Sequence, residues 1–251
     1  MTTVAVLADP PRPGLVCSTL ADETPLSRQE TAELYTAMLR DSCRAVEQSG
    51  GDLLVNYRAD DDVPEEFAGE ESAEAAVRAA VRPALDDPDE ARFEVQVGST
   101  FAARVGNTVT HLLEQEEVAT AAAVEPTAPF LARQGIDNAA MKLRRNEVVL
   151  GPASDGRVYY AGFSAPIDFD GAYTQPTVRT LTDRGDDAGL GVDFLPMQPV
   201  LESEADLVTV LTQIQARQRA GRQVPEYTTE FFDEIGLDVR EADDRLTVVR
   251  D

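Results

Sequence analysis

The stretch from Gly151 to Gly156 has the residue types and spacing of a ligand-binding loop. The apolar run from Val148 to Leu150 predicts a buried strand, which Gly151 and Pro152 end. Asp155 and Gly156 predict a tight turn, because glycine reaches the positive φ angles that such turns need. Loops of this kind line pockets at the ends of strands in α/β sheets. The candidate ligand-binding residues here are Gly151, Pro152, Asp155 and Gly156, and a plain turn of the sheet explains them equally well.

Three other places near predicted strand ends carry residues that could contact a ligand. The loop after the first strand holds Arg12, Pro13 and Gly14, and a rigid proline-rich surface loop is the alternative interpretation. Arg104 lies near the start of a predicted helix, where it would meet a phosphate or remain a solvated arginine. Glu125 follows the fourth predicted strand and is a weak candidate for a metal ligand, so no metal site is assigned with it.

The sequence assigns no catalytic residue. Its single histidine, His111, lies within a predicted helix, where we expect it to be exposed, and it forms no Ser-His-Asp or Cys-His pattern. Cys17 and Cys43 make no zinc pattern with it, and Cys43 is expected in the core. Asp168 and Asp170 could supply acid or base groups, but pairs of acidic residues are common in so acidic a chain.

The charge balance narrows the classes of partner. The 251 residues include 46 acidic and 22 basic ones, for a net charge of −24. Molar salt would screen the resulting repulsion, so we interpret the acidity as a halophile's solvated surface, with a basic partner as the alternative. Nucleic acid is excluded as a partner because no basic stripe is present. No apolar run reaches membrane-spanning length and no signal segment is evident, so we expect a cytoplasmic protein.

The order of predicted elements indicates the fold class. Strands are expected at 3–7, 53–57, 93–97, 118–124, 148–150, 158–160 and 192–195, and helices at 28–49, 73–85, 100–116, 130–144, 176–181, 203–220 and 227–235, with a loop over 182–191. Strands that alternate with helices predict one three-layer α/β domain with a mostly parallel sheet. We expect this domain to span residues 1–236, with 237–251 as a C-terminal tail or edge strand.

Several of these runs are similar to the motifs of one family. The strongest is Val149 to Ala153 with Asp155-Gly156 and Tyr159-Tyr160, which looks like the run Val-Leu-Gly-Pro-Ala-x-Asp-Gly-Gly-Tyr-Tyr. Weaker matches are Pro13-Gly14-x-Val16, Tyr35 to Asp41 and Ala205 to Leu207. The chain thereby resembles the glycosyltransferase-A-like family known as radical-SAM/selenodomain-associated transferases, as a divergent member of haloarchaeal type.

The resemblance implies the nucleotide-diphospho-sugar transferase fold and a transfer reaction. A sugar or nucleotidyl group would pass from a nucleotide-activated donor to an acceptor hydroxyl, with a divalent cation, Mg²⁺ or Mn²⁺, holding the diphosphate. The expected ligand is therefore a nucleotide or nucleotide-sugar. Phospholactate guanylyltransferases have a similar fold, so a nucleotidyltransferase related to them is an alternative.

The charged residues of the family's motifs are largely missing. Cys17 to Leu20 stand where the family has Lys-Thr-Arg-Leu, and Ser99 to Arg104 keep only the arginine of Gly-Asp-Leu-Gly-x-Arg. After the fourth strand, Thr127 and Phe130 replace two aspartates, which leaves Glu125 as the only carboxylate expected nearby. The metal- and phosphate-binding motifs thus look degenerate. A non-catalytic nucleotide-binding or regulatory protein on the same scaffold is the alternative to an enzyme.

Overall fold

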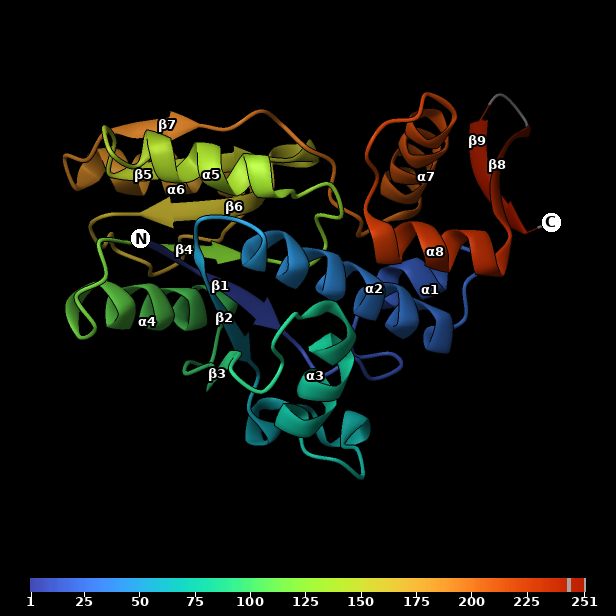
Figure 1. The fold of residues 1–251 in the computed structure, drawn as a ribbon, viewed down its shortest axis with the longest axis horizontal. Coiled ribbons are helices and arrows are strands. Elements are labelled where there is room, and N and C mark those ends of the chain that lie inside the picture. The colour runs from blue at the N-terminus through green and yellow to red at the C-terminus, as the bar shows by residue number, and fades with distance from the viewer. Residues whose placement is uncertain (243–244, 251) are drawn as a thin grey trace.

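Strand β1 (Thr2–Ala8) is buried along its whole length and lies inside a seven-stranded sheet. The computed structural model describes residues 1–242 and 245–250. The strand order is β3-β2-β1-β4-β6-β5-β7, as Figure 1 shows. Apolar runs such as that of β1 form strands that are covered on both faces, which is typical of parallel sheets.

The sheet is parallel except around one strand. The other strands are β2 (Asp52–Tyr57), β3 (Arg92–Val95), β4 (Thr120–Val124), β5 (Val148–Pro152), β6 (Val158–Phe163) and β7 (Val192–Phe194). Strand β6 runs antiparallel to both neighbours, β4 and β5. It does so because a short 3-10 turn (Ser154–Gly156) reverses the chain after β5, as the Asp155-Gly156 pair predicts.

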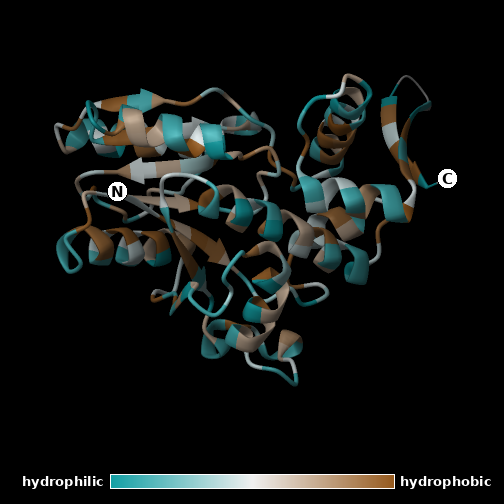
Figure 2. Cartoon of the chain, viewed as in Figure 1, coloured by the Kyte–Doolittle hydropathy of each residue, from teal (hydrophilic) through white to brown (hydrophobic). Residues whose placement is uncertain are grey.

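Helices cover both faces of the sheet and make the three predicted layers. One face carries α2 (Arg28–Glu47), α3 (Ala73–Val81) and α5 (Arg133–Lys142), and the other carries α4 (Phe101–Glu114) and α6 (Thr177–Asp187). Figure 2 shows β1 and β2 in brown, hydrophobic colours, and the helices around the sheet in a mixture of teal and brown. The prediction of a single α/β domain with a mostly parallel sheet is therefore confirmed.

Helix α2 is buried on two sides. It begins with a capping box, in which Ser27 and Glu30 cap each other's backbone N–H groups, as a serine followed three residues later by a glutamate predicts. One face, including Leu39 and Cys43, packs on the sheet. A second face, including Leu34 and Met38, packs on a further apolar cluster that the C-terminal helices complete. The helix therefore joins the sheet to the C-terminal part of the chain.

The C-terminal elements pack together beside one end of the sheet (Figure 1). They are the helices α7 (Glu204–Arg219) and α8 (Glu226–Ile235) and the strands β8 (Leu237–Ala242) and β9 (Arg245–Arg250). The two strands form an antiparallel hairpin that pairs with no other strand of the described chain. The segment 237–251, expected to be a tail or edge strand, contains this hairpin. The domain boundary after residue 236 stays a prediction, and residues 243–244 and Asp251 lie outside the described residues.

Helix boundaries show two departures from the sequence predictions. The loop expected over 182–191 is wrong in its first part, because α6 continues to Asp187. The helix passes so close to the sheet at Gly185 that a Cβ there would lie 2.7 Å from Cγ2 of Val192 in the underlying strand. Only glycine therefore fits at this position of the helix. Helix α5 begins at Arg133 rather than near Phe130, because residues 127–131 form a turn first.

The remaining short elements are α1 (Ser18–Glu23) and 3-10 turns at Asp60–Asp62, Glu65–Phe67 and Arg82–Ala84. The last of these follows α3 at Pro83, where the sequence predicts an early end of the helix. Across residues 1–242 and 245–250, no helix is both long and apolar enough to cross a membrane.

Candidate functional site

A pocket of about 330 Å³ opens at the carboxyl ends of β1 and β4. The chain proceeds from β1 to β2 and β3 on one side of the sheet, while β4 lies on the other side of β1. Loops after two such strands diverge, and the crevice between them is where open α/β sheets bind ligands. Its polar lining residues are Asp9, Ser18, Thr19, Tyr35, Gln96, Arg104, Glu125, Thr127 and Glu202.

Glu125 lies at the base of this pocket, directly after β4. Burial, followed by the negative charges of Glu202 and Asp9, raises the pKa of Glu125 to about 8. The expectation that Glu125 is the only carboxylate nearby is therefore wrong, because two others line the same pocket. Three carboxylates that repel one another favour a proton or a cation between them.

Asp9 directly follows β1 and is held through its backbone. Its N–H donates to Oη of Tyr35 at 2.8 Å. Its Oδ1 is buried and accepts no hydrogen bond, although Nη1 of Arg58 lies 3.5 Å away. Burial raises the pKa of Asp9 in spite of that arginine and Arg104. A cation that binds this oxygen would therefore share it with Arg58 or replace that ion pair.

Glu202 comes from the segment before α7 and is held at both oxygens. Its Oε1 accepts a hydrogen bond from Oγ1 of Thr127 at 3.1 Å, and its Oε2 accepts one from Nη1 of Arg157 at 3.0 Å. Arg157 also binds both oxygens of the buried Asp206, at 2.8 and 2.9 Å. Arg157 therefore fixes the turn after β5 to the start of α7 and orients Glu202 at the pocket.

Arg104 is the one basic side chain among the described residues that line the pocket. It is half-buried, its Nε is buried without a hydrogen bond, and burial lowers its pKa. Its guanidinium carbon lies 5.7 Å from the centroid of the Phe101 ring. A guanidinium with an unpaired N–H in a pocket suits an anion, and phosphate contact by Arg104 stays a prediction.

The Arg12–Gly14 loop supports the pocket wall without lining it. Arg12 donates hydrogen bonds to the carbonyl oxygens of Phe67 and Glu71, at 3.0 and 2.8 Å. Pro13 forms an isolated bridge with Val16, which does line the pocket, and Gly14 adopts a φ of 83°. These bonds hold Arg12 against the acidic loop after β2, and ligand contact by Arg12, Pro13 or Gly14 stays a prediction.

The predicted Gly151–Gly156 loop is also outside the lining residues of this pocket. Pro152 pairs with Val158, and Asp155, with a φ of 57°, makes an exposed ion pair with Arg157 at 3.4 Å. A Cβ on Gly156 would lie 2.6 Å from Cβ of Pro176. The loop reaches the pocket indirectly, through Arg157 and Glu202, and direct ligand binding by its residues stays a prediction.

Gly151 is required by packing. A Cβ at this position would lie 2.6 Å from Cζ of Tyr159, which is fully buried. We expect Gly151→Ala to lower the free energy of unfolding by roughly 2 kcal/mol, as overpacked cores do. Urea unfolding followed by circular dichroism measures this, with Gly135→Ala as control, since a Cβ there meets only ordinary contacts. Equal midpoints for the two variants would contradict the packing role.

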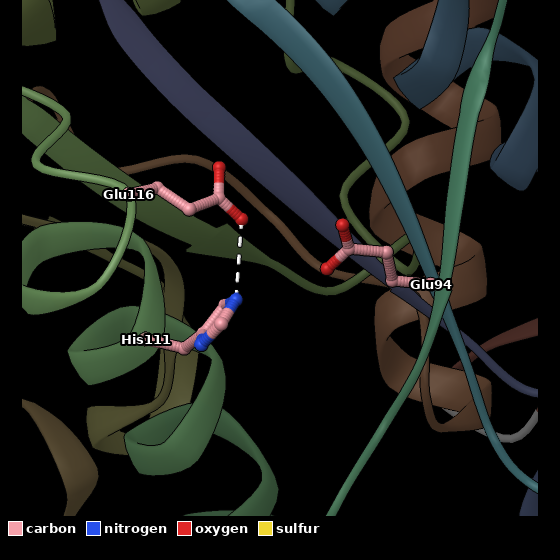
Figure 3. Close-up of side chains that lie close together, drawn as sticks. All are labelled: Glu94, His111 and Glu116. Atoms are coloured by element: carbon pink, nitrogen blue, oxygen red, sulfur yellow. Dashed lines mark ion pairs between the residues drawn. The ribbon is translucent and has the colours of Figure 1, made fainter.

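A separate group of possible metal ligands lies at the edge of the sheet. Glu94, His111 and Glu116 can each bring one ligand atom within 4.8 Å of the others. Figure 3 shows Glu94 facing the other two, with the His111–Glu116 ion pair dashed at 3.3 Å. Arg92 donates hydrogen bonds to both glutamates, so its guanidinium already neutralises part of the negative charge of this group. His111 is exposed, as predicted.

Comparisons with known proteins give structural neighbours only. No family model matches the chain, and no curated protein sequence matches it. A solved candidate nucleotide-diphospho-sugar transferase from Desulfovibrio desulfuricans G20 is similar over 93% of this chain and 94% of its own, with a TM-score of 0.75 and 19% identity.

Two more distant neighbours are cytidylyl-transfer proteins. A 4-diphosphocytidyl-2C-methyl-D-erythritol synthase from Anaerococcus prevotii covers 85% of this chain and 99% of its own, with a TM-score of 0.48 and 12% identity. A cytidylyltransferase from Leptospira borgpetersenii covers 93% and 94%, with a TM-score of 0.48 and 9% identity. The first neighbour, together with the sheet order, shows that this chain has the fold of a nucleotide-diphospho-sugar transferase.

Proposed function

We propose that the protein binds a nucleotide or nucleotide-sugar in the β1–β4 pocket and transfers a sugar or nucleotidyl group from it with a divalent cation. The observation that carries this proposal is the meeting of Asp9, Glu125 and Arg104 at the crevice between β1 and β4. Carboxylates there suit a cation, and the guanidinium suits a phosphate.

The donor set fits Mg²⁺ or Mn²⁺. Both cations prefer carboxylate oxygens, and Asp9 has a buried oxygen that accepts no hydrogen bond. Glu125 and Asp9 would hold the cation, while Glu202, whose oxygens bind Thr127 and Arg157, would add negative charge. The bound cation would neutralise charge on the departing diphosphate.

The charges in the pocket make the cation necessary for a phosphate ligand. Three carboxylates and one arginine line it, and Cys17, Ser18 and Thr19 add no positive charge. Once Glu125 is ionised, this lining would repel a nucleotide alone more than it would repel a nucleotide–cation complex. We therefore expect nucleotide affinity to depend on the cation.

A second candidate function is binding without turnover, in a regulatory protein. The uncharged stretch from Cys17 to Thr19 favours this alternative. A transferase must neutralise the charge that develops on its leaving group, and this stretch provides no positive charge for that purpose. On this alternative the pocket would retain nucleotide affinity but release no product. Transfer of a nucleotidyl group rather than a sugar is the other variant of the enzymatic proposal.

The test is a titration of nucleoside triphosphates and nucleotide-diphospho-sugars, with Mn²⁺ or with EDTA, in about 1 M KCl because of the chain's acidity. We expect calorimetry to detect binding only with Mn²⁺, and Asp9→Asn to weaken it at least about 10-fold. Asp61→Asn, in an exposed loop, is the matched control. Equal affinity in EDTA would contradict the proposal, and binding without nucleotide, diphosphate or sugar release over hours would favour the regulatory alternative.

A further inference from the structure

A second pocket, of about 280 Å³, lies beyond the loop that follows β4. Residues 126–127 of this loop line the first pocket, and residues 129–132 line the second. Its basic lining residues are Arg44 from α2, Arg133 from α5 and Arg217 from α7. Three arginines from three helices are unusual in a chain with 46 acidic and 22 basic residues.

Arg217 is held in place by stacking and not by an acidic partner. Its guanidinium carbon lies 4.3 Å from the centroid of the Phe130 ring, on the floor of the pocket. Within residues 1–242 and 245–250, its side chain makes no ion pair or hydrogen bond. A guanidinium stacked in this way keeps its N–H donors directed outward for an anion.

The start of α5 adds further donors to the same pocket. Ala132 is the N-cap residue and provides no side-chain cap. The carbonyl of Ala132 accepts the first bonds of the helix, from the N–H groups of Gly135 and Ile136. The N–H of Arg133, which lines the pocket, comes before these donors and is available to a ligand. The Arg133 side chain is exposed and pairs only with Asp137, one turn along the helix, at 3.3 Å. Such exposed pairs contribute little and yield readily to a better acceptor.

The two acidic residues that line this pocket are already engaged. Both oxygens of Asp41 accept hydrogen bonds from the start of α8: Oδ1 from the N–H of Tyr227 at 3.0 Å, and Oδ2 from the N–H and Oγ1 of Thr228 at 2.8 and 2.7 Å. Glu226 pairs with Arg44 at 3.6 Å. The pocket lining thus holds three arginines against two carboxylates, and Arg217 is the arginine without an acidic partner among the described residues.

We propose that this pocket binds a phosphate group, either inorganic phosphate or that of a small phosphomonoester. Planar guanidinium groups and the N-terminus of a helix are the donors that phosphates prefer. The volume of the pocket exceeds that of phosphate alone, so it also accommodates a small organic group. This site is separate from the nucleotide pocket and does not depend on the proposed transferase function.

The experiment is a calorimetric titration of the full chain with inorganic phosphate and with ribose 5-phosphate, in about 0.5 M KCl. We expect saturable binding, weakened at least about 10-fold by Arg217→Gln. Arg219→Gln is the matched control, because Arg219 lies on the same helix and does not line the pocket. Tighter binding of ribose 5-phosphate would identify a phosphomonoester as the ligand, and equal affinities would identify inorganic phosphate.

Three results would overturn the site. They are no binding by the unmodified chain, equal affinities in Arg217→Gln and the unmodified chain, and loss of binding with Arg104→Gln but not with Arg217→Gln. The last result would move phosphate binding to the nucleotide pocket. Because Arg217 is exposed, the substitution should leave the fold intact, and matching thermal transitions check this.

Discussion

We expect Arg157→Met to lower the free energy of unfolding by about 3 to 5 kcal/mol, the range for a buried carboxylate that loses its partner. Arg157 is 14% exposed and Asp206 is 7% exposed, so water cannot replace the two hydrogen bonds between them. Most of the lost free energy comes from the ion pair with Asp206. The ion pair between Arg157 and Glu202 stabilises the fold less, because Glu202 is more exposed.

Urea unfolding in KCl measures this effect. Arg179→Met is the control, because Arg179 is exposed on α6. Combining Arg157→Met with Asp206→Asn should recover part of the loss, since no unpaired charge is then buried and the asparagine Oδ1 can still accept from the N–H of Ser203. An unfolding midpoint that does not move in Arg157→Met would show that this ion pair does not hold the turn to α7.

Glu125→Gln should stabilise the protein more and more as the pH rises. The pKa of Glu125 is about 8 in the folded chain, against an ordinary value of 4.5, because burial and two neighbouring carboxylates oppose its ionisation. The folded state therefore holds a proton that the unfolded state releases, and stability falls as pH rises from 4.5 to 8. Glutamine has no proton to lose, so its advantage grows by roughly 3 kcal/mol between about pH 5 and 9.

Denaturant midpoints of both proteins across this pH range test the prediction. Glu230→Gln, at an exposed position on α8, gives the background change for removal of one surface charge. A stability difference that stays constant with pH would mean that Glu125 is ionised throughout. The same titration predicts that Mn²⁺ binds more weakly below about pH 8, where a proton occupies Glu125.

The framework of the fold could be predicted from the sequence, because its signals are local. The Ser27 capping box, the β-branched run of β5 and the Asp155-Gly156 turn each involve a few adjacent residues. The extension of α6 could not be predicted in this way. Gly185 reads as a helix breaker, and the reason for it is a close contact with Val192 on a neighbouring strand.

The candidate site was predictable only in part, for a related reason. Glu125 and Arg104 stand beside recognisable element ends, and both line the pocket. Asp9 carries the same signal, since it directly follows β1, and that signal was missed. Glu202 carries no such signal in the sequence. Its carboxylate accepts a hydrogen bond from Thr127, which is 75 residues earlier, so only the tertiary fold brings Glu202 to the pocket.

The two buried faces of α2 have a consequence for how the chain is made. The face with Leu39 and Cys43 finds its partners once the first strands have emerged. The face with Leu34 and Met38 waits for α7 and α8, which are synthesised more than 150 residues later. During that interval the nascent chain presents an apolar stripe to solvent or a chaperone. A chain cut before α7 would keep that stripe exposed and tend to aggregate.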